Sequence, residues 1–345
     1  MGPGYDALLL LSFGGPEGPE DVLPFLRNVT RGRGIPEQRL TTVAEHYQHF
    51  GGVSPINAQN RALSAAIEAD FAANGVPLRL YWGNRNWTPY VGDALNQMRL
   101  DGVRRALVLA TSATGSYSGC RQYRDDLAGA QEQLGAGAPE LVKLRHYFDH
   151  PGFIAAHADG VRAALSELPG ALRAGARLVC TAHSIPATMN AQSGPIGGLY
   201  LAQQRETARL VAEQVRGPGA DVDLVWQSRS GPPQVRWLEP DINDHLRVLA
   251  TAGVGSVVVS PTGFVTDHLE IVWDLDTEAR RTAAELGLGF ARAATASAHP
   301  AFVEMVRELV LEEVAGYPAR SAGALGSYGR DCPSWCCPPP QRPGG

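Results

Sequence analysis

Eight short, nearly continuous apolar runs recur along the chain, and most of them are followed by a helical stretch rich in Ala, Leu or Arg. In chain order the runs occupy residues 5–13, 78–83, 106–112, 140–147, 176–184, 222–228, 255–261 and 288–293. Apolar strands that alternate with helices are typical of parallel sheets covered on both faces. The two sets of four predict an α/β protein with two doubly wound domains, each built on a four-stranded parallel sheet flanked by helices.

The helical pattern HPAFVEMVRELVLEEV follows the last strand and is expected to pack back on the first half. We therefore predict an N-terminal domain of residues 1–148 plus 297–316, and a C-terminal domain of residues 149–296. From Gly316 onward the composition turns to Gly, Pro, Ser and Cys, so an ordered domain is expected to end there. Residues 317–345 would form a tail.

Composition narrows the class of protein. The chain has 345 residues, 44% of them hydrophobic, and 30 basic against 35 acidic residues, which is globular and gives no electrostatic basis for nucleic-acid binding. No apolar run approaches the roughly 20 residues of a membrane span, and no basic segment precedes the first run. These features predict no transmembrane segment and a cytoplasmic location. Five cysteines, an odd number, argue against a disulfide framework.

Polar residues just past strand ends are the first functional candidates, because open α/β sheets bind ligands beyond the carboxyl ends of their strands. His183, in CTAHSIP, stands at such an end. A lone histidine is as often a satisfied structural residue, so both interpretations remain open.

The stretch PTGFVTDHLEIVWDLD ends a strand and is expected to begin a helix at Thr266. At about 100° per residue, Glu270, Asp274 and Glu278 share one stripe, while His268 points away from it. An ordinary amphipathic helix explains part of this pattern, but a ladder of carboxylates also suits hydrated divalent cations. Glu270 could approach the distant His183, and such a pair serves either metal binding or proton transfer.

A second candidate surface lies near the N-terminus. The loop RNVTRGRGIP carries Arg31 and Arg33, and GGVSPINAQN places Ser54 before a helix. The loop could be solvated surface charge, or it could receive carboxylates or phosphates of a ligand. Ser54 could equally be a helix cap.

Taken together, these segments resemble the ferrochelatase family. SFGGPEGPEDVLPFLRNVTRGRGIP, HYQHFGGVSPINAQN, GNRNWTPY, TAHSIP, WQSRSGPPQVRWLEP and PTGFVTDHLEIVWDLD match its signature segments in order, over about residues 5 to 315. SYSGCRQYRDDL resembles the actinobacterial branch, which is associated with coproporphyrin. The resemblance implies two Rossmann-like, chelatase-like domains with the tetrapyrrole between them.

The activity implied is that of a lyase of heme biosynthesis. It would insert Fe²⁺, as substrate, into coproporphyrin III to give coproheme and release two protons. A protoporphyrin ferrochelatase, another tetrapyrrole metal chelatase, and a non-catalytic tetrapyrrole or iron carrier are the alternatives. The resemblance also implies transient contact with a downstream enzyme of the heme pathway.

The resemblance assigns His183 and Glu270 to the iron and the pyrrole nitrogens, and Asp274 and Glu278 to an acidic access path. The residues that would contact the porphyrin are Arg31, Arg33, His46, Tyr47, Ser54 and Tyr123, with Tyr117 as second choice to Tyr123. The chain departs from the family at Phe13, where some relatives have a tyrosine, and at Thr30, where an arginine of the propionate loop is expected.

The tail carries Cys332, Cys336 and Cys337. Some ferrochelatases bind a [2Fe–2S] cluster through three such cysteines and a fourth near the start of the second half, but the corresponding segment here, GFIAAHADG, has no cysteine. Cys120, Cys180, His157 or a partner chain would have to supply the fourth ligand. A cluster and a tail with idle thiols therefore both remain open.

Overall fold

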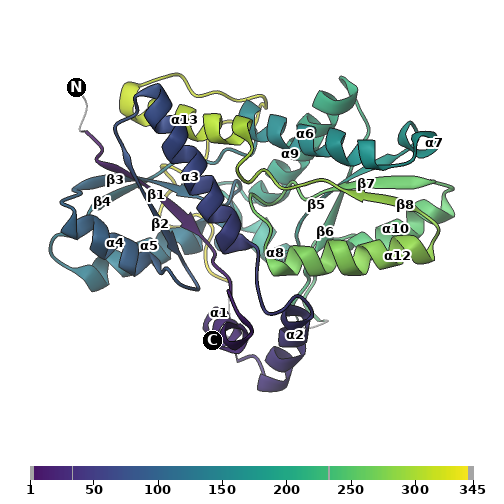
Figure 1. The fold of residues 1–345 in the computed structure, drawn as a ribbon, viewed down its shortest axis with the longest axis horizontal. Coiled ribbons are helices and arrows are strands. Elements are labelled where there is room, and N and C mark those ends of the chain that lie inside the picture. Colours follow the sequence, from purple (N-terminus) through teal and green to yellow (C-terminus); the bar gives the residue numbers. More distant parts are fainter. Residues whose placement is uncertain (1–3, 33, 232–233, 341–345) are drawn as a thin grey trace.

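The computed structural model describes residues 4–32, 34–231 and 234–340, and it contains two four-stranded parallel sheets (Figure 1). The first sheet has the order β2-β1-β3-β4 and the second has the equivalent order β6-β5-β7-β8. The strands are β1 (Ala7–Ser12), β2 (Arg79–Asn84), β3 (Arg105–Ala110), β4 (Glu140–Lys143), β5 (Arg177–His183), β6 (Asp223–Gln227), β7 (Ser256–Ser260) and β8 (Gly289–Arg292). The predicted fold class is confirmed, and one strand overlaps each of the eight apolar runs.

Helices connect and cover the strands. In the first half they are the short 3-10 helix η1 (Pro19–Asp21), α1 (Val22–Val29), α2 (Glu37–His49), α3 (Ile56–Asn74), α4 (Val91–Leu100), the π-helical η2 (Tyr117–Arg121) and α5 (Gln122–Leu134). In the second half they are α6 (Pro151–Glu167), α7 (Gly170–Arg173), α8 (Ala187–Ala191), α9 (Leu199–Arg216), α10 (Ile242–Thr251), α11 (Leu269–Ile271), the π-helical η3 (Val272–Ala279) and α12 (Arg280–Glu285), followed by α13 (Pro300–Ala315). None of these described helices is long and apolar enough to cross a membrane.

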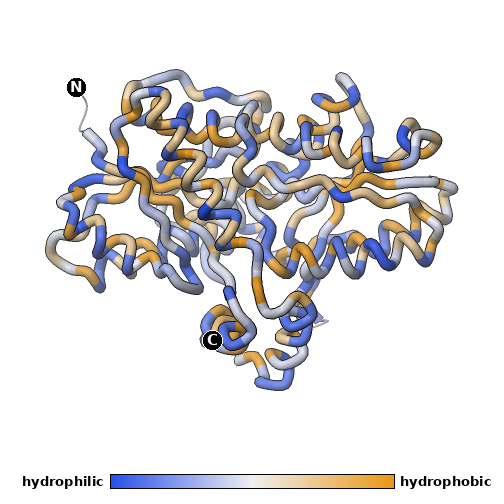
Figure 2. Tube along the Cα trace, viewed as in Figure 1, coloured by the Kyte–Doolittle hydropathy of each residue, from blue (hydrophilic) through white to orange (hydrophobic). Residues whose placement is uncertain are grey.

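The apolar strands are explained by burial on both faces. In β1, Leu8 and Leu10 pack with α3, α6 and α13, while Leu9 and Leu11 pack with α4 and α5 on the opposite face. The second sheet is covered in the same way, by α6 and α9 on one face and by α10, α11, η3 and α12 on the other. The strands β1 and β7 accordingly form hydrophobic bands inside their halves (Figure 2).

The helices α6 and α13 join the two halves. The α13 residue Phe302 packs with Phe153 of α6 in the core of the first sheet, as expected for a returning helix. Ile154 and Val161, also on α6, belong to the core of the second sheet. Because α6 contributes to both cores, the boundary placed before residue 149 falls next to a shared helix, and the exact domain limits stay a prediction.

The helices α1 and α2 project from the body of the molecule in Figure 1 and have a small core of their own. Phe25 and Leu26 of α1 pack there against Leu40 and Ala44 of α2. Of the residues expected to contact the porphyrin, His46 and Tyr47 lie on α2.

Composition predicts that the ordered domain ends near Gly316, and this domain limit stays a prediction. The helix α13 ends there, with Gly316 in the left-handed conformation, but the chain then packs against the body without forming a helix or strand. The His146 amide donates to the Tyr328 carbonyl at 2.7 Å, and the Ala322 amide to the Asp149 carbonyl at 2.8 Å. Composition could not reveal these bonds, because they join residues far apart in the sequence.

Candidate active site

His183 is the last residue of β5, the strand at the centre of the second sheet. Its Nδ1 bonds the carbonyl oxygen of Ser184, and a carbonyl oxygen can only accept, so Nδ1 carries the hydrogen. In the neutral ring this leaves Nε2 as the acceptor. The Tyr200 hydroxyl donates to the His183 carbonyl at 2.7 Å and helps to hold the end of the strand.

The structure brings Glu270 to His183. The distance from His183 Nε2 to Glu270 Oε2 is 3.8 Å, and the two side chains are 35% and 41% exposed. The helix that carries Glu270 begins one residue after His268, which occupies the N-cap position, and not at Thr266 as expected. Desolvation by the surrounding protein atoms raises the pKa of Glu270, although a hydrogen bond with Ser228 opposes the shift.

Asp274 lies four residues after Glu270, in the π-helical segment η3. The carboxylates of Glu270, Asp274 and Glu278 are together called the acidic wall below. The Ser228 hydroxyl donates to Asp274 Oδ2, and the Gln227 amide lies 3.4 Å from the same oxygen. Burial first, and the charge of Glu270 second, raise the pKa of Asp274. The two carboxyl groups therefore form a coupled pair that holds a proton more strongly than isolated carboxyls would.

Glu278 lies further along η3, where Trp273 Nε1 donates to its Oε1 at 3.0 Å. The Trp273 ring stacks on His46 of α2, with ring centroids 3.9 Å apart and 7° between the planes. This stack joins the projecting helices of the first half to the acidic wall of the second half.

Tyr47, the neighbour of His46, also faces the wall. Burial, and secondarily the Glu270 carboxylate, raise the pKa of Tyr47. Arg31 is exposed at the end of the α1 segment, and Arg33 lies outside the described residues. The structure thus brings together His183, Glu270, Asp274, Glu278, His46 and Tyr47, while Arg31 stands apart on the loop.

Two of the residues expected to contact the porphyrin, Tyr123 and Ser54, are buried away from the acidic wall. Tyr123 is 5% exposed in the core of the first half, and the Arg85 guanidinium lies 4.3 Å from its ring centroid. Tyr117, the second choice, is half-buried in η2. Ser54 is 3% exposed and packs so closely under Gly15 that a Cβ there would lie 2.7 Å from its own Cβ.

His268 lies apart from the acidic wall, in a half-buried position. Burial, and secondarily the charge of His183, lower its pKa to about 3, so it stays neutral. Its ring packs edge-on against Phe264 at 5.4 Å between centroids. Across residues 4–32, 34–231 and 234–340, no group of three or more His, Cys, Asp or Glu side chains is arranged to hold a metal ion, so the His183–Glu270 pair is an incomplete metal shell.

Sequence reasoning missed Ser228 and Trp273 as parts of the site. Ser228 directly follows β6 and adopts a φ of 63°, which turns its hydroxyl towards the carboxylates. Its position after a strand was the same signal that identified His183. Nothing in the local sequence indicated that Trp273 has a partner on α2.

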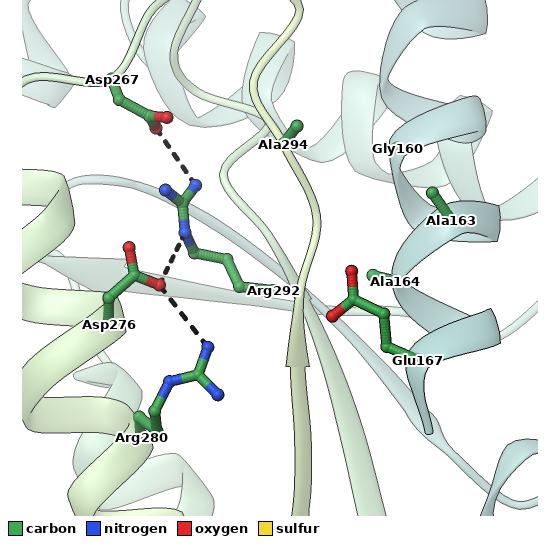
Figure 3. Close-up of a pocket in the computed structure, with 9 residues that line it drawn as sticks. All are labelled: Gly160, Ala163, Ala164, Glu167, Asp267, Asp276, Arg280, Arg292 and Ala294. Atoms are coloured by element: carbon green, nitrogen blue, oxygen red, sulfur yellow. Dashed lines mark hydrogen bonds and ion pairs between the residues drawn. The ribbon is translucent and has the colours of Figure 1, made fainter. Parts of the chain in front are cut away.

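A separate pocket of about 290 Å³ lies on the second half, between α6, the end of β8 and the helix that follows η3 (Figure 3). Arg292 lies in it between Asp267, at 3.1 Å, and Asp276, at 2.9 Å. Asp267 is therefore the partner of an arginine, apart from the stripe of Glu270, Asp274 and Glu278. The charges that line this pocket are largely paired with one another, and His183, Glu270, Asp274 and Glu278 do not line it.

Comparison with known proteins identifies the family of this chain. The model of the family described as ferrochelatase matches residues 5–314. The chain is 56% identical to the coproporphyrin III ferrochelatase of Nocardia farcinica, over 98% of both chains, and 57% identical to that of Mycolicibacterium smegmatis, over 92% of both chains. It is 55% identical to that of Streptomyces griseus subsp. griseus, over 97% of this chain and 93% of the relative.

Among solved structures, the sirohydrochlorin chelatase SirB of Bacillus subtilis subspecies spizizenii, in complex with cobalt, aligns with a TM-score of 0.52 over 91% of this chain and 97% of that chain. At 10% identity, this likeness shows the fold alone. Because the family match covers most of the chain and the relatives are more than half identical over nearly their full length, the protein belongs to the ferrochelatase family.

Proposed function

We propose that this protein inserts Fe²⁺ into coproporphyrin III and releases two protons, a lyase reaction of heme biosynthesis. The observation that carries the proposal is the His183–Glu270 pair, whose Nε2 and Oε2 atoms lie 3.8 Å apart at the end of a central strand. An imidazole nitrogen and a carboxylate are both ligands for a borderline metal and bases for a pyrrole proton. The high identity to proteins named coproporphyrin III ferrochelatase supports the choice of substrate.

Proton removal is the first chemical requirement, because the metal replaces two pyrrole N–H hydrogens. Glu270 and Asp274 share a raised pKa, which makes either carboxylate a stronger base than an exposed one. His183, with Nδ1 committed to the Ser184 carbonyl, presents Nε2 for a proton or for the metal. One proton would pass to this group of bases for each N–H bond broken, and from there to solvent through the exposed fractions of His183 and Glu270.

Delivery of iron is the second requirement. Asp274 and Glu278 continue the acidic wall from Glu270 along η3, and carboxylates bind hydrated divalent cations weakly enough for release. A loosely held substrate ion needs no complete set of protein ligands. The pair of His183 and Glu270 at the start of the acidic wall is consistent with this requirement.

The tetrapyrrole is proposed to lie against α2, with its propionates directed to the basic loop. Coproporphyrin has four propionates, and arginine pairs with carboxylates through strong charge-assisted hydrogen bonds. Arg31 and Arg33 are the proposed partners, His46 and Tyr47 would contact the ring side, and Tyr117 replaces Tyr123 as the proposed aromatic contact. Transfer of the product to a downstream heme-pathway enzyme stays a prediction.

The test is an anaerobic Fe²⁺ assay with coproporphyrin III and protoporphyrin IX in parallel. We expect loss of free-porphyrin absorption with coproporphyrin III, and a fall of at least about a hundredfold in kcat in His183→Ala and Glu270→Gln, as for the loss of an acid–base group. Arg61→Ala replaces an exposed residue outside the site and is the control: it should keep wild-type turnover. Retained turnover in both site variants would exclude the assigned roles.

The same assay separates the alternatives. A carrier would bind the tetrapyrrole stoichiometrically without metalation, and a protoporphyrin enzyme would prefer the dicarboxylate substrate. A cobalt or nickel chelatase would show a higher rate with those ions than with Fe²⁺. The raised pKa of the wall carboxylates Glu270 and Asp274 favours an enzyme over a carrier, because a carrier has no need of a proton acceptor.

A further inference from the structure

The first turns of α9 carry three buried polar side chains whose partners lie in both halves of the molecule. Tyr200, Gln203 and Gln204 are spaced i, i+3 and i+4, so they share one face of the helix. They are 6%, 0% and 1% exposed. A buried polar group without a hydrogen bond is costly, so the partners of these side chains show which segments this face of α9 holds in place.

Tyr200 holds the peptide group that follows His183. A trans peptide is planar, so the C=O of His183 and the N–H of Ser184 point in opposite directions. The N–H donates to the Gln227 carbonyl of β6 at 2.8 Å. The C=O accepts from the Tyr200 hydroxyl at 2.7 Å, beyond Cys180, where the pairing of β5 with β7 ends. Both polar atoms of this peptide are therefore held in hydrogen bonds.

The orientation of this peptide decides where the His183 ring points. The ring Nδ1 donates to the carbonyl oxygen of Ser184, the residue at the other end of the same peptide. A rotated peptide would displace that oxygen, and the ring would lose the bond that keeps Nε2 directed to Glu270, at 3.8 Å. The Tyr200 ring packs against that of Trp226, with 5.8 Å between centroids. Burial raises the pKa of Tyr200, so the hydroxyl keeps the hydrogen that it donates.

The same face of α9 also holds the loop of the first half that leads to Tyr117. Gln203 Oε1 accepts from the Gly115 amide at 2.7 Å, and Gln204 Nε2 lies 3.3 Å from Thr114 Oγ1. The π-helical η2 begins two residues after Gly115, with Tyr117. One helical face therefore contacts segments of both halves: the end of β5 and the loop before η2.

We propose that Tyr200 is a positioning residue for iron insertion, which orients His183 through the peptide that follows it, and that Gln203 fixes the Tyr117 segment relative to that histidine. Tyr200 acts through the backbone of His183 and takes no proton in the reaction. The inference rests on the proposed function, since the orientation of His183 matters to the rate only if its ring meets the metal or a pyrrole proton.

The two positioning residues are expected to affect different kinetic constants. A displacement of a reacting group by about 1 Å slows the chemical step strongly, so loss of the Tyr200 bond should lower kcat. The Gln203 bond holds a segment proposed to contact the tetrapyrrole, so its loss should raise KM for coproporphyrin III.

Tyr200→Phe tests the first part in the anaerobic assay with Fe²⁺ and coproporphyrin III, because it removes the hydroxyl and keeps the ring. We expect kcat to fall about tenfold, with KM for coproporphyrin III within about twofold of wild type. Tyr147→Phe is the matched control: the buried Tyr147 hydroxyl donates to the carbonyl of Ala110, the last residue of β3, also at 2.7 Å. This control should keep wild-type kcat. A wild-type kcat in Tyr200→Phe, or an equal fall in both variants, would overturn the positioning role.

A measurement that needs no turnover separates this inference from the proposed function. In protein with isotope-labelled histidines, nuclear magnetic resonance of wild-type His183 should show the tautomer with its hydrogen on Nδ1. Tyr200→Phe should add the tautomer with its hydrogen on Nε2, while Tyr147→Phe should not, and His183→Ala assigns the signals. Identical ring signals in Tyr200→Phe and wild type would contradict the inference. Changed signals in a protein that inserts no iron would instead contradict the proposed function and keep the role of Tyr200 in orienting His183.

Gln203→Leu tests the second part, because it leaves the Gly115 amide without its acceptor. Hydrogen exchange of this amide should rise at least about tenfold, and KM for coproporphyrin III at least about threefold. Thr207→Val, one turn further along α9, loses a buried bond to the Phe148 carbonyl and should change neither quantity. Unchanged exchange in Gln203→Leu would overturn this part. Where that variant does not fold, wild type decides: slow exchange of the Gly115 amide supports the link, and fast exchange overturns it.

Discussion

At the scale of single residues, the acidic wall combines burial with solvent access. Glu270 has a raised pKa because protein atoms displace water from around it, yet 41% of its side chain remains exposed. A carboxyl group of this kind can receive a proton from a ligand and pass it to solvent. Its protonation must then appear in the pH dependence of both folding and activity.

The first prediction concerns stability. A folded-state pKa above the unfolded value means that the folded protein binds the proton more tightly. The stability that Glu270 contributes is present below its ordinary pKa, about 4.3, and is lost as the pH rises through the raised value. Glu270→Gln is therefore expected to lose less thermal stability than wild type between about pH 4 and pH 8. Exposed Glu285→Gln is the control, and parallel melting curves for wild type and Glu270→Gln would contradict the prediction.

The second prediction concerns activity and Ser228. Its hydroxyl bonds the carboxylates and lowers the pKa of both, so its loss should raise them further. Ser228→Gly removes the hydroxyl without strain, because the residue has a φ of 63°. The acid limb of the pH–rate profile should move upward by roughly one unit, since a hydrogen bond to a charged group contributes about 1.5–3 kcal/mol. An unmoved acid limb with a lower plateau would mean that Ser228 only positions the wall.

The residue scale also shows what local sequence can predict. His183 and Glu270 were paired because each follows a strand of the same predicted sheet, and the carboxyl ends of parallel strands share one edge. Tyr123 was preferred to Tyr117 on resemblance alone, and burial beneath Arg85 could not be read from a segment that contains two similar tyrosines. Whether these residues act as assigned stays a prediction until variants are measured.

At the scale of elements, the eight strands were predictable because burial on both faces leaves uninterrupted apolar runs. The π-helices η2 and η3 were not predictable, because a shift in backbone hydrogen bonding leaves no distinct residue pattern. Helical angles based on 100° per residue still grouped Glu270, Asp274 and Glu278. The widened turn adds a bond between Trp273 and Glu278, five residues apart, which those angles do not suggest.

The third prediction concerns the contact between α2 and η3. The His46 ring stacks on Trp273, and aromatic pairs contribute about 0.5–1.5 kcal/mol beyond their buried area. His46→Ala should therefore increase hydrogen exchange in the last turns of α2 by roughly two- to tenfold. His46→Phe keeps a stacking ring and should exchange as wild type does. Equal exchange in all three proteins would show that the α1–α2 core alone holds the projection in place.

At the scale of the whole molecule, Asp267 connects the two halves. Its Oδ1 pairs with Arg292 at 3.1 Å, its Oδ2 accepts from Gln59 of α3 at 3.2 Å, and its amide donates to Gln59 Oε1 at 2.8 Å. The Asp267 and Arg292 side chains are only 12% and 11% exposed. Sequence could not predict this link, because its members come from three segments that share no local pattern.

Asp267→Asn should destabilise the protein by about 3 kcal/mol, since removing one partner of a buried ion pair leaves a poorly compensated charge. Arg292 keeps Asp276, which limits the loss to the lower end of the usual range. Urea unfolding measures the change, and Asp276→Asn, whose side chain is 28% exposed, should cost less. A double-mutant cycle with Gln59→Ala then isolates the link between halves: a coupling of about 0.5 kcal/mol or more is expected for residues in direct contact. Strict additivity, or equal losses for Asp267→Asn and Asp276→Asn, would mean that α6 and α13 hold the halves together without this network.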